Sequence, residues 1–395
     1  VKIGSPLFFN KVDPDVKWGS PACGTVKTIE YGPRRVIQKI EIQLSDSQES
    51  EKNKKYKNSE IIGLDREVAI DTILGANIFP FFRQRPFNII PDPKVIPRDI
   101  FVSAINTAPL AFDQEVVIKE NLDSFQAGVD ALNTLTSGKV YLTSKTGSVV
   151  SSIQNVESYT IDGPHPAGNV GIQIHHISHL KPGENVWTIN SQDVIAIGKL
   201  FLRGLYDPMR VITLAGPCIK EPGHFRVNAG AKISNITNGR MIDNEKRIIS
   251  GDVLTGRGTS HEDFLSFYDY SISVISDEVK REFIGMLNPG SSSSRYSLTP
   301  VFLSLSKLLY PFNTSQNGSH RAVVPINAWE RVLPMDILPN ELYRSILAKD
   351  IDEMEMLGLL ECDDEDFALC SFACPSKTDV SGVIREGLDI LQAEG

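Results

Sequence analysis

A change of pattern near Pro97 limits the possible folds of this 395-residue sequence more than any other feature. Beyond it, the apolar run Ile100–Ile105 is followed by a helical face between Leu122 and Leu132, and then by a second apolar run at Lys139–Thr143. The same order of strand and helix recurs between Ser158 and Phe201. Regular alternation of this kind predicts an α/β domain with a largely parallel sheet.

The segments on either side of this domain have different patterns. The first residues form short β runs separated by Gly and Pro, as in part of a small β-barrel. A polar, lysine-rich stretch follows, and a helix is expected over Ile61–Leu74. Short strands with a brief helix after Val211 indicate a β-grasp module, and Pro339 opens a helix in the last part. The expected parts are a barrel portion at 1–44, a linker with an aromatic and arginine-rich segment at 45–95, the α/β domain at 96–207, the β-grasp domain at 208–290, and a helical domain at 291–395 that follows the flexible stretch Gly290–Ser294.

Composition excludes several classes of protein. The formal net charge of −9 disfavours a dedicated nucleic-acid binder, because such proteins cluster cations to hold phosphates. Five cysteines form an odd number, which favours a reducing compartment over a disulfide framework. No uncharged apolar run reaches the roughly 18 residues that cross a bilayer, and the best candidate, Val301–Phe312, is interrupted by polar residues. The chain starts with Val1 and not Met, so the absence of a leader sequence is weak evidence about targeting.

The loop Asp162–Gly171 follows an expected strand, which is where open α/β sheets bind ligands. Its glycines could let the backbone approach a phosphate or a ring. However, the loop is not G-x-G-x-x-G, and Pro164 and Pro166 remove amide donors. The following Gly171–Ile177 segment alternates like a strand and does not open a helix. A rigid structural loop is therefore favoured over a dinucleotide site.

Histidines and cysteines each suggest a metal or cluster site that their spacing does not support. His175 and His176 would point to opposite faces of a strand, so with His165 and His179 they hardly converge on one ion. Three cysteines with C-x7-C and C-x3-C spacing do not make a four-thiolate iron–sulfur motif, and buried thiols are the simpler interpretation. The acidic stretch Glu361–Asp366 is interpreted as a solvated helix face. The three cysteines are Cys362, Cys370 and Cys374.

The segment Phe79–Phe87 concentrates four phenylalanines around Arg83 and Arg85. Aromatic faces can sandwich a flat ring, and a guanidinium can donate to the carbonyl oxygens of that ring. A quinone-like head group suits this chemistry. The structural alternative is a seam between domains that is packed by phenylalanines, with the two arginines at its rim.

Taken together, several segments resemble one family, the A-type subunits (NqrA) of the bacterial sodium-translocating NADH:quinone oxidoreductase. They run in the family's order over nearly the whole chain. The segments are Arg83–Phe87, Ser137–Tyr141, Asp162–Gly168, Ile249–Gly256, Trp329–Pro339 and Leu360–Pro375.

The resemblance implies an α+β multidomain fold: a barrel-sandwich-hybrid remnant, a Rossmann-like domain, an SLBB-type β-grasp domain and a helical end. It also implies a peripheral component on the cytoplasmic face of the inner membrane, with no tightly bound cofactor of its own. The implied partners are the other subunits, especially an integral membrane subunit; flavins and iron–sulfur centres would lie on them. Ubiquinone is the implied substrate of the complex, with Na+ export as its output, and the isolated chain would not be catalytic. The residues matched to quinone binding are Phe82, Arg83, Arg85, Pro86 and Phe87.

Two alternatives compete with this accessory role. One is a free-standing flavin- or dinucleotide-binding oxidoreductase that uses the Gly163–Gly171 loop. The other is a structural scaffold that binds no ligand. Retained flavin in the purified chain distinguishes the first alternative, and quinone affinity distinguishes the second.

Overall fold

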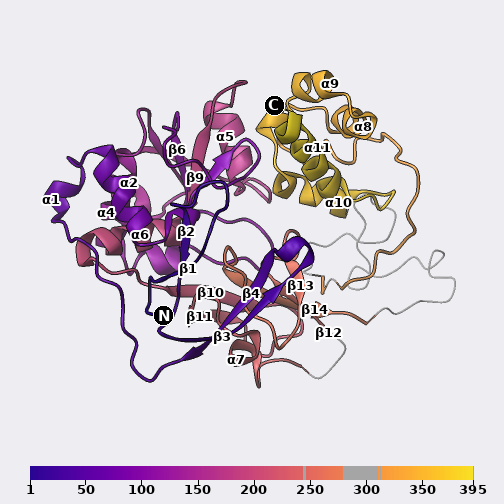
Figure 1. Ribbon diagram of the computed structural model, residues 1–395. Coiled ribbons are helices and arrows are strands. Elements are labelled where there is room, and N and C mark those ends of the chain that lie inside the picture. Colours follow the sequence, from indigo (N-terminus) through magenta and orange to yellow (C-terminus); the bar gives the residue numbers. More distant parts are fainter. Residues whose placement is uncertain (243–245, 279–309, 312, 395) are drawn as a thin grey trace.

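The computed structural model describes residues 1–242, 246–278, 310–311 and 313–394 (Figure 1). The expected stretch Gly290–Ser294, the proposed boundary at residue 290 and nearly all of Val301–Phe312 lie outside the described residues. In the part of the chain that is described, no helix is both long and apolar enough to cross a bilayer.

The α/β domain is built on a five-stranded sheet in the order β5-β9-β6-β7-β8. Neighbouring strands from β9 to β8 run parallel, and β5 adds an antiparallel edge. The prediction of a largely parallel sheet is confirmed. The strands are β5 (Arg83–Arg85), β6 (Ile100–Ser103), β7 (Val140–Ser144), β8 (Glu157–Thr160) and β9 (Val186–Asn190).

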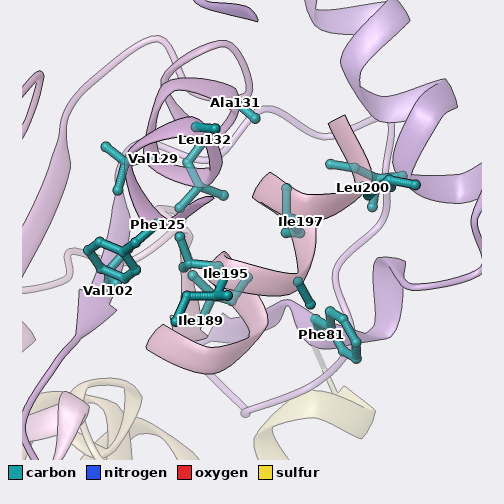
Figure 2. Packing of buried hydrophobic residues seen from close by; sticks show 14 of the residues in the cluster. Phe81, Val102, Phe125, Val129, Ala131, Leu132, Ile189, Ile195, Ile197 and Leu200 are labelled. Carbon is teal, nitrogen blue, oxygen red and sulfur yellow. The ribbon is translucent and has the colours of Figure 1, made fainter. Parts of the chain in front are cut away.

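Helices cover both faces of this sheet. The pair α4 (Leu122–Asn133) and α6 (Ser191–Arg203) covers one face, where Phe125, Leu132 and Ile197 fill the space between them (Figure 2). A Cβ added at Gly198 would collide with the backbone of α4, so this close crossing needs glycine. The other face carries α5 (Val170–Ser178), which packs Ile174 against the sheet. Three further helices pack into the same core: α1 (Asn58–Ile61), α2 (Arg66–Gly75) and α3 (Glu115–Ile118).

The first residues form two separate β ribbons, β1 (Pro6–Phe9) with β2 (Lys17–Gly19), and β3 (Gly24–Tyr31) with β4 (Ile37–Leu44). The second ribbon is amphipathic. Thr28 pairs with Glu41 and Glu30 with Lys39, whereas Val26, Ile29 and Tyr31 pair with isoleucines of β4. Such a ribbon is the β-rich element that the Gly and Pro punctuation predicts.

The β-grasp domain contains a second five-stranded sheet, in the order β11-β10-β14-β12-β13. Its central strands β10 and β14 are parallel, and their outer neighbours are antiparallel to them. This arrangement around one short helix confirms the β-grasp prediction. The elements are β10 (Met209–Ala215), β11 (Gly223–Asn228), α7 (Ile233–Thr237), β12 (Lys246–Ser250), β13 (Arg257–Thr259) and β14 (Ser271–Ser276).

The end of the chain forms a helical unit, drawn in yellow in Figure 1. Pro339 occupies the first turn of α8, as predicted, because its missing N–H costs nothing there. The core of the unit also includes Ile172 from α5, so the helical unit and the α/β domain share buried surface. The helices are α8 (Pro339–Ala348), α9 (Ile351–Met356), the 3-10 turns η5 (Leu359–Glu361) and η6 (Asp364–Phe367), α10 (Ala368–Ala373) and α11 (Val380–Glu394).

Candidate functional site

The candidate quinone-binding residues lie directly before β5, on it and in the turn that follows it. The 3-10 turn η2 (Phe79–Phe81) leads into β5, which pairs antiparallel with β9. The Arg85–Pro86 peptide bond is cis, and Phe87 and Asn88 both have positive φ. This tight turn returns the chain so that Gln84 N donates to Ile89 O at 2.7 Å. The segment 82–89 therefore forms a compact corner at the edge of the sheet.

Phe82 belongs to the hydrophobic core. Its ring is fully buried and lies 5.2 Å from the ring of Trp187 and 5.4 Å from that of Phe79, measured between centroids. A quinone could reach this ring only if the core opened. Phe82 therefore positions the corner and offers no free aromatic face.

Arg83 is the partly exposed cation of the segment. Its guanidinium lies 5.1 Å from the ring centroid of Tyr268, a residue of the β-grasp domain. Arg83 Nε donates to Asn88 Oδ1 at 3.0 Å, and Nη2 donates to the carbonyl of Asn88. These contacts hold the guanidinium over an aromatic ring, with part of the side chain still exposed to solvent.

Arg85 lies inside the seam between the α/β domain and the helical unit, so its predicted place at the rim is wrong. Only 4% of Arg85 is exposed. Its Nη1 lies 2.8 Å from an oxygen of Asp363 and its Nη2 lies 2.7 Å from one of Glu365. Burial alone would lower the pKa of Arg85, but the surrounding carboxylates raise it above its usual value.

The acidic stretch Glu361–Asp366 is not a solvated helix face, and that interpretation is also wrong. Asp363 and Asp366 are at most 1% exposed. Asp363 accepts from Arg85 and from Asn88 Nδ2 at 2.7 Å, and lies 3.4 Å from Arg385 of α11. The run of charge turns inward because two arginines and an amide lie in the seam and pair with it.

Phe87, which follows Pro86, forms the side of the corner that meets the helical unit. Phe87 is partly buried against the core of that unit, and its carbonyl accepts from Arg385 Nη1 at 3.0 Å. The seam packed by phenylalanine, proposed as the structural alternative, is therefore present at Phe87. The five candidate residues are adjacent in the chain, but their side chains lie in two different environments, the sheet core and the seam.

The Asp162–Gly171 loop is followed by α5 and not by a strand, which corrects the expectation for Gly171–Ile177. The buried carboxylate of Asp366 faces the first turn of this helix, where a Cβ at Gly171 would collide with its Oδ2. Asn169 Nδ2 donates to the carbonyl of Glu365 at 3.1 Å. A phosphate on this loop would bind at the same helix end. That place is occupied by the chain's own Asp366.

Since α5 is a helix, His175 and His176 do not lie on opposite faces of a strand as expected. His175 Nδ1 lies 2.9 Å from Glu361 Oε2, and its Nε2 accepts from Asp336 N at 3.1 Å. His176 Nε2 donates to the Pro334 carbonyl at 2.7 Å. Both imidazoles thus join α5 to the helical unit. Among the residues described, no three His, Cys, Asp or Glu side chains form a group that could hold a metal ion.

The three clustered cysteines are free and fully buried in the helical unit, as the simpler interpretation predicted. Burial raises the pKa of the Cys370 thiol to about 12 and raises that of Cys362 well above its usual value. Protonated thiols are poor nucleophiles, and all three cysteine side chains pack in the hydrophobic core of the helical unit.

The residues that complete this corner were not identified from sequence: Asn88, Tyr268, Asp363, Asp366 and Arg385. One local signal was available. Asp363 and Asp366 are three residues apart, and they form a capping box at η6 in which each carboxylate accepts from the backbone N–H of the other residue. That spacing favours ordered rather than solvated acids, although it does not reveal their arginine partners.

Comparison with known proteins gives matches along the chain. Three family models match: the NqrA N-terminal barrel-sandwich hybrid domain at 1–45, the NqrA second alpha/beta domain at 64–206 and the NQRA C-terminal domain at 211–261. The sequence is 40% identical over 402 residues to the A-type subunit of the Na(+)-translocating NADH-quinone reductase of Saccharophagus degradans, covering 100% of this chain and 89% of that protein. The protein of the same name from Vibrio atlanticus is 40% identical over 399 residues, with the same coverage. Among solved structures, an NAD+-reducing NiFe-hydrogenase in the H2-reduced state matches with a TM-score of 0.41 and 11% identity, over 55% of this chain and 48% of that one.

Proposed function

The chain belongs to the NqrA family, the A-type subunits of the Na(+)-translocating NADH-quinone reductases. We propose that it works as a peripheral component of such a complex and contributes to quinone contact and assembly. The complex oxidises NADH, reduces a quinone and moves Na+ across a membrane. The observation that carries this proposal is the match of the whole chain to proteins of that name at 40% identity. The comparisons give no support to a free-standing flavin- or dinucleotide-binding oxidoreductase.

The finer part of the proposal concerns the location of the cofactors and of this chain in the complex. We propose that flavins and iron–sulfur centres lie on partner subunits, with ubiquinone as the electron acceptor, and that this chain lies on the cytoplasmic face of the inner membrane beside an integral membrane subunit. The spacing C-x7-C and C-x3-C of Cys362, Cys370 and Cys374 supports this division, because it offers three thiols where a cluster motif needs four.

Within the chain, the proposed quinone contact is the corner formed by Phe82, Arg83, Arg85, Pro86 and Phe87. The packing assigns them unequal parts. Phe82 and Arg85 are buried and engaged, so they hold the corner in shape. Arg83 and Phe87 keep exposed surface, and Arg83 has donors that can turn toward a carbonyl oxygen. Contact with a quinone therefore falls to Arg83, with Phe87 as a neighbouring apolar surface.

Complementation tests the assignment to the complex. In a bacterium that lacks its own NqrA, expression of this chain should restore Na+-stimulated NADH-quinone reductase activity in membrane vesicles, and the chain should co-purify with the membrane subunits. A chain that accumulates in folded form but neither co-purifies nor restores activity contradicts the proposal.

The Arg83→Ala variant tests the quinone contact in the same vesicles. Loss of a hydrogen bond from a charged donor costs about 1.5–3 kcal/mol, so the KM for a short-chain ubiquinone should rise roughly ten- to a hundredfold. The amount of assembled complex should not change. Arg257→Ala, which removes an exposed arginine of β13, serves as the control. An unchanged KM in assembled Arg83→Ala complex would remove the corner from quinone binding.

A further inference from the structure

Residues 267–270 lie just before β14 of the β-grasp domain, but their side chains meet the α/β domain. Phe267 packs against the hydrophobic core of the α/β domain, and its ring lies 5.8 Å from that of Phe81 between centroids. Tyr268 OH donates to the carbonyl of Pro80 at 2.9 Å. This segment of the β-grasp domain therefore contacts η2, the turn that leads into β5 and the corner.

A buried arginine holds the segment in place. Arg210 of β10 is 6% exposed, and its guanidinium lies 5.4 Å from the ring centroid of Phe267 and 4.8 Å from that of Tyr270. Its Nη1 donates to the carbonyl of Phe267 at 2.8 Å, and its Nη2 lies 3.4 Å from Asp193 Oδ1 on α6. A guanidinium that meets a carboxylate, a carbonyl and aromatic rings has little freedom to move. The backbone beside Tyr268 is therefore fixed relative to the α/β domain.

Tyr268 links this fixed segment to Arg83. The Arg83 guanidinium lies 5.1 Å from the centroid of the Tyr268 ring, and its Nη1 lies 3.5 Å from the Tyr268 hydroxyl, at the limit of a hydrogen bond. The ring of Phe267 meets the Tyr268 ring edge-on at 4.8 Å between centroids, which restricts its rotation. Because Tyr268 is 42% exposed, burial of its own surface is a weak reason for its position. The contact with the cation is the stronger one.

We infer that Tyr268 is a positioning residue, through which the β-grasp domain holds the Arg83 guanidinium at the corner. Nε and Nη2 of Arg83 donate to Asn88, so Nη1 is its least engaged donor. Tyr268 thus sets the direction in which Arg83 can offer a hydrogen bond to a ligand. The inference rests on the proposed function for the identity of that ligand, whereas the position of the guanidinium can be measured in the isolated chain.

Modification of arginines by phenylglyoxal in the purified full chain, followed by mass spectrometry, tests the inference. In Tyr268→Leu, the guanidinium loses its aromatic partner, so Arg83 should be modified about two- to fivefold faster than in the wild type. Tyr268→Phe keeps the ring and should react like the wild type. Tyr159→Leu is the matched control, because Tyr159 is also 42% exposed but lies on β8, at the opposite edge of the sheet from β5.

Buried Arg210 is the internal reference for folding and should stay unmodified in every variant. An unchanged rate at Arg83 in Tyr268→Leu overturns the inference. An equal rise in Tyr268→Phe also overturns it, because the ring would then not be the group that holds Arg83. Modification of Arg210 together with Arg83 in Tyr268→Leu would mean general loosening of the fold, which contradicts a positioning role as well.

Kinetics of the assembled complex in membrane vesicles supply a second readout. Tyr268→Leu should raise the KM for a short-chain ubiquinone about two- to fivefold and leave kcat unchanged. In the Arg83→Ala background the same change should have no further effect, because a residue that acts through Arg83 cannot act without it. An equal rise in both backgrounds overturns the inference. If Arg83→Ala itself leaves the KM unchanged, the corner is removed from quinone binding, and the phenylglyoxal rates still decide whether Tyr268 positions Arg83.

Discussion

Asp366 shows how a single side chain can make the seam sensitive to pH. It is fully buried, one of its oxygens has no hydrogen-bond partner within the described residues, and it lies beside Asp363 and Glu365. Burial, followed by repulsion from Glu365, raises its pKa well above 3.8. A carboxyl group with a raised pKa binds a proton more tightly in the folded state than in the unfolded chain. The folded protein is then favoured at low pH, and this contribution to the free energy of unfolding is lost as the pH rises through the pKa of the folded state.

Replacement by an isosteric neutral amide should remove this dependence. In Asp366→Asn, the free energy of unfolding should fall less between pH 4 and pH 8 than in the wild type, and at pH 8 the variant should be the more stable protein. Urea denaturation at several pH values measures this difference. Asp336→Asn, at a more exposed acid of the helical unit, is the control and should reproduce the wild-type profile. Identical pH profiles for Asp366→Asn and wild type would show that Asp366 is ionised in the seam.

At the scale of elements, α5 explains both a failed prediction and the shape of the seam. Val170–Ser178 reads as alternating because Ile172 packs against the helical unit and Ile174 packs against the sheet. A helix buried on two sides lacks the single polar face that identifies an amphipathic helix.

The parallel sheet and the helices α4 and α6 could be predicted, because each has a one-sided apolar pattern or a continuous apolar run. The buried acids could not, because their arginine partners are remote in sequence.

Gly171 tests the contact between α5 and η6. A methyl group at this position would collide with Asp366 Oδ2, so Gly171→Ala should lower the free energy of unfolding by about 1–3 kcal/mol. Gly258→Ala is the control, because a Cβ there meets no atom within 4 Å and its φ is not positive. Equal stability of the two variants in urea denaturation would mean that the seam yields to the added methyl group without cost.

At the scale of the molecule, the seam joins the helical unit to the α/β domain through groups that are far apart in the chain. Arg85 of β5 binds Asp363 and Glu365, Arg385 of α11 donates to the Phe87 carbonyl, and His175 of α5 binds Glu361. Figure 1 shows α5 beside the helical unit, above the β-grasp domain. The corner proposed to contact quinone thus lies where the α/β domain meets the helical unit, and its shape depends on the contacts between them.

Because of this dependence, loss of the Arg85 cation should loosen the contact between the α/β domain and the helical unit. In Arg85→Met, Asp363 and Glu365 lose the cation that they share, and Asp363 keeps Arg385 and Asn88 as partners, which costs about 3 kcal/mol. Because the β-grasp core does not include the seam, the loss should be local. Hydrogen exchange followed by mass spectrometry should therefore show faster exchange in Val170–Ser178 and Ala368–Ala373, and unchanged exchange in Ser271–Ser276. Arg226→Ala, which removes an exposed ion pair with Glu120, should change none of these segments. Uniform acceleration across all three segments in Arg85→Met would mean that the molecule opens as one unit, and that the seam is not a separate joint.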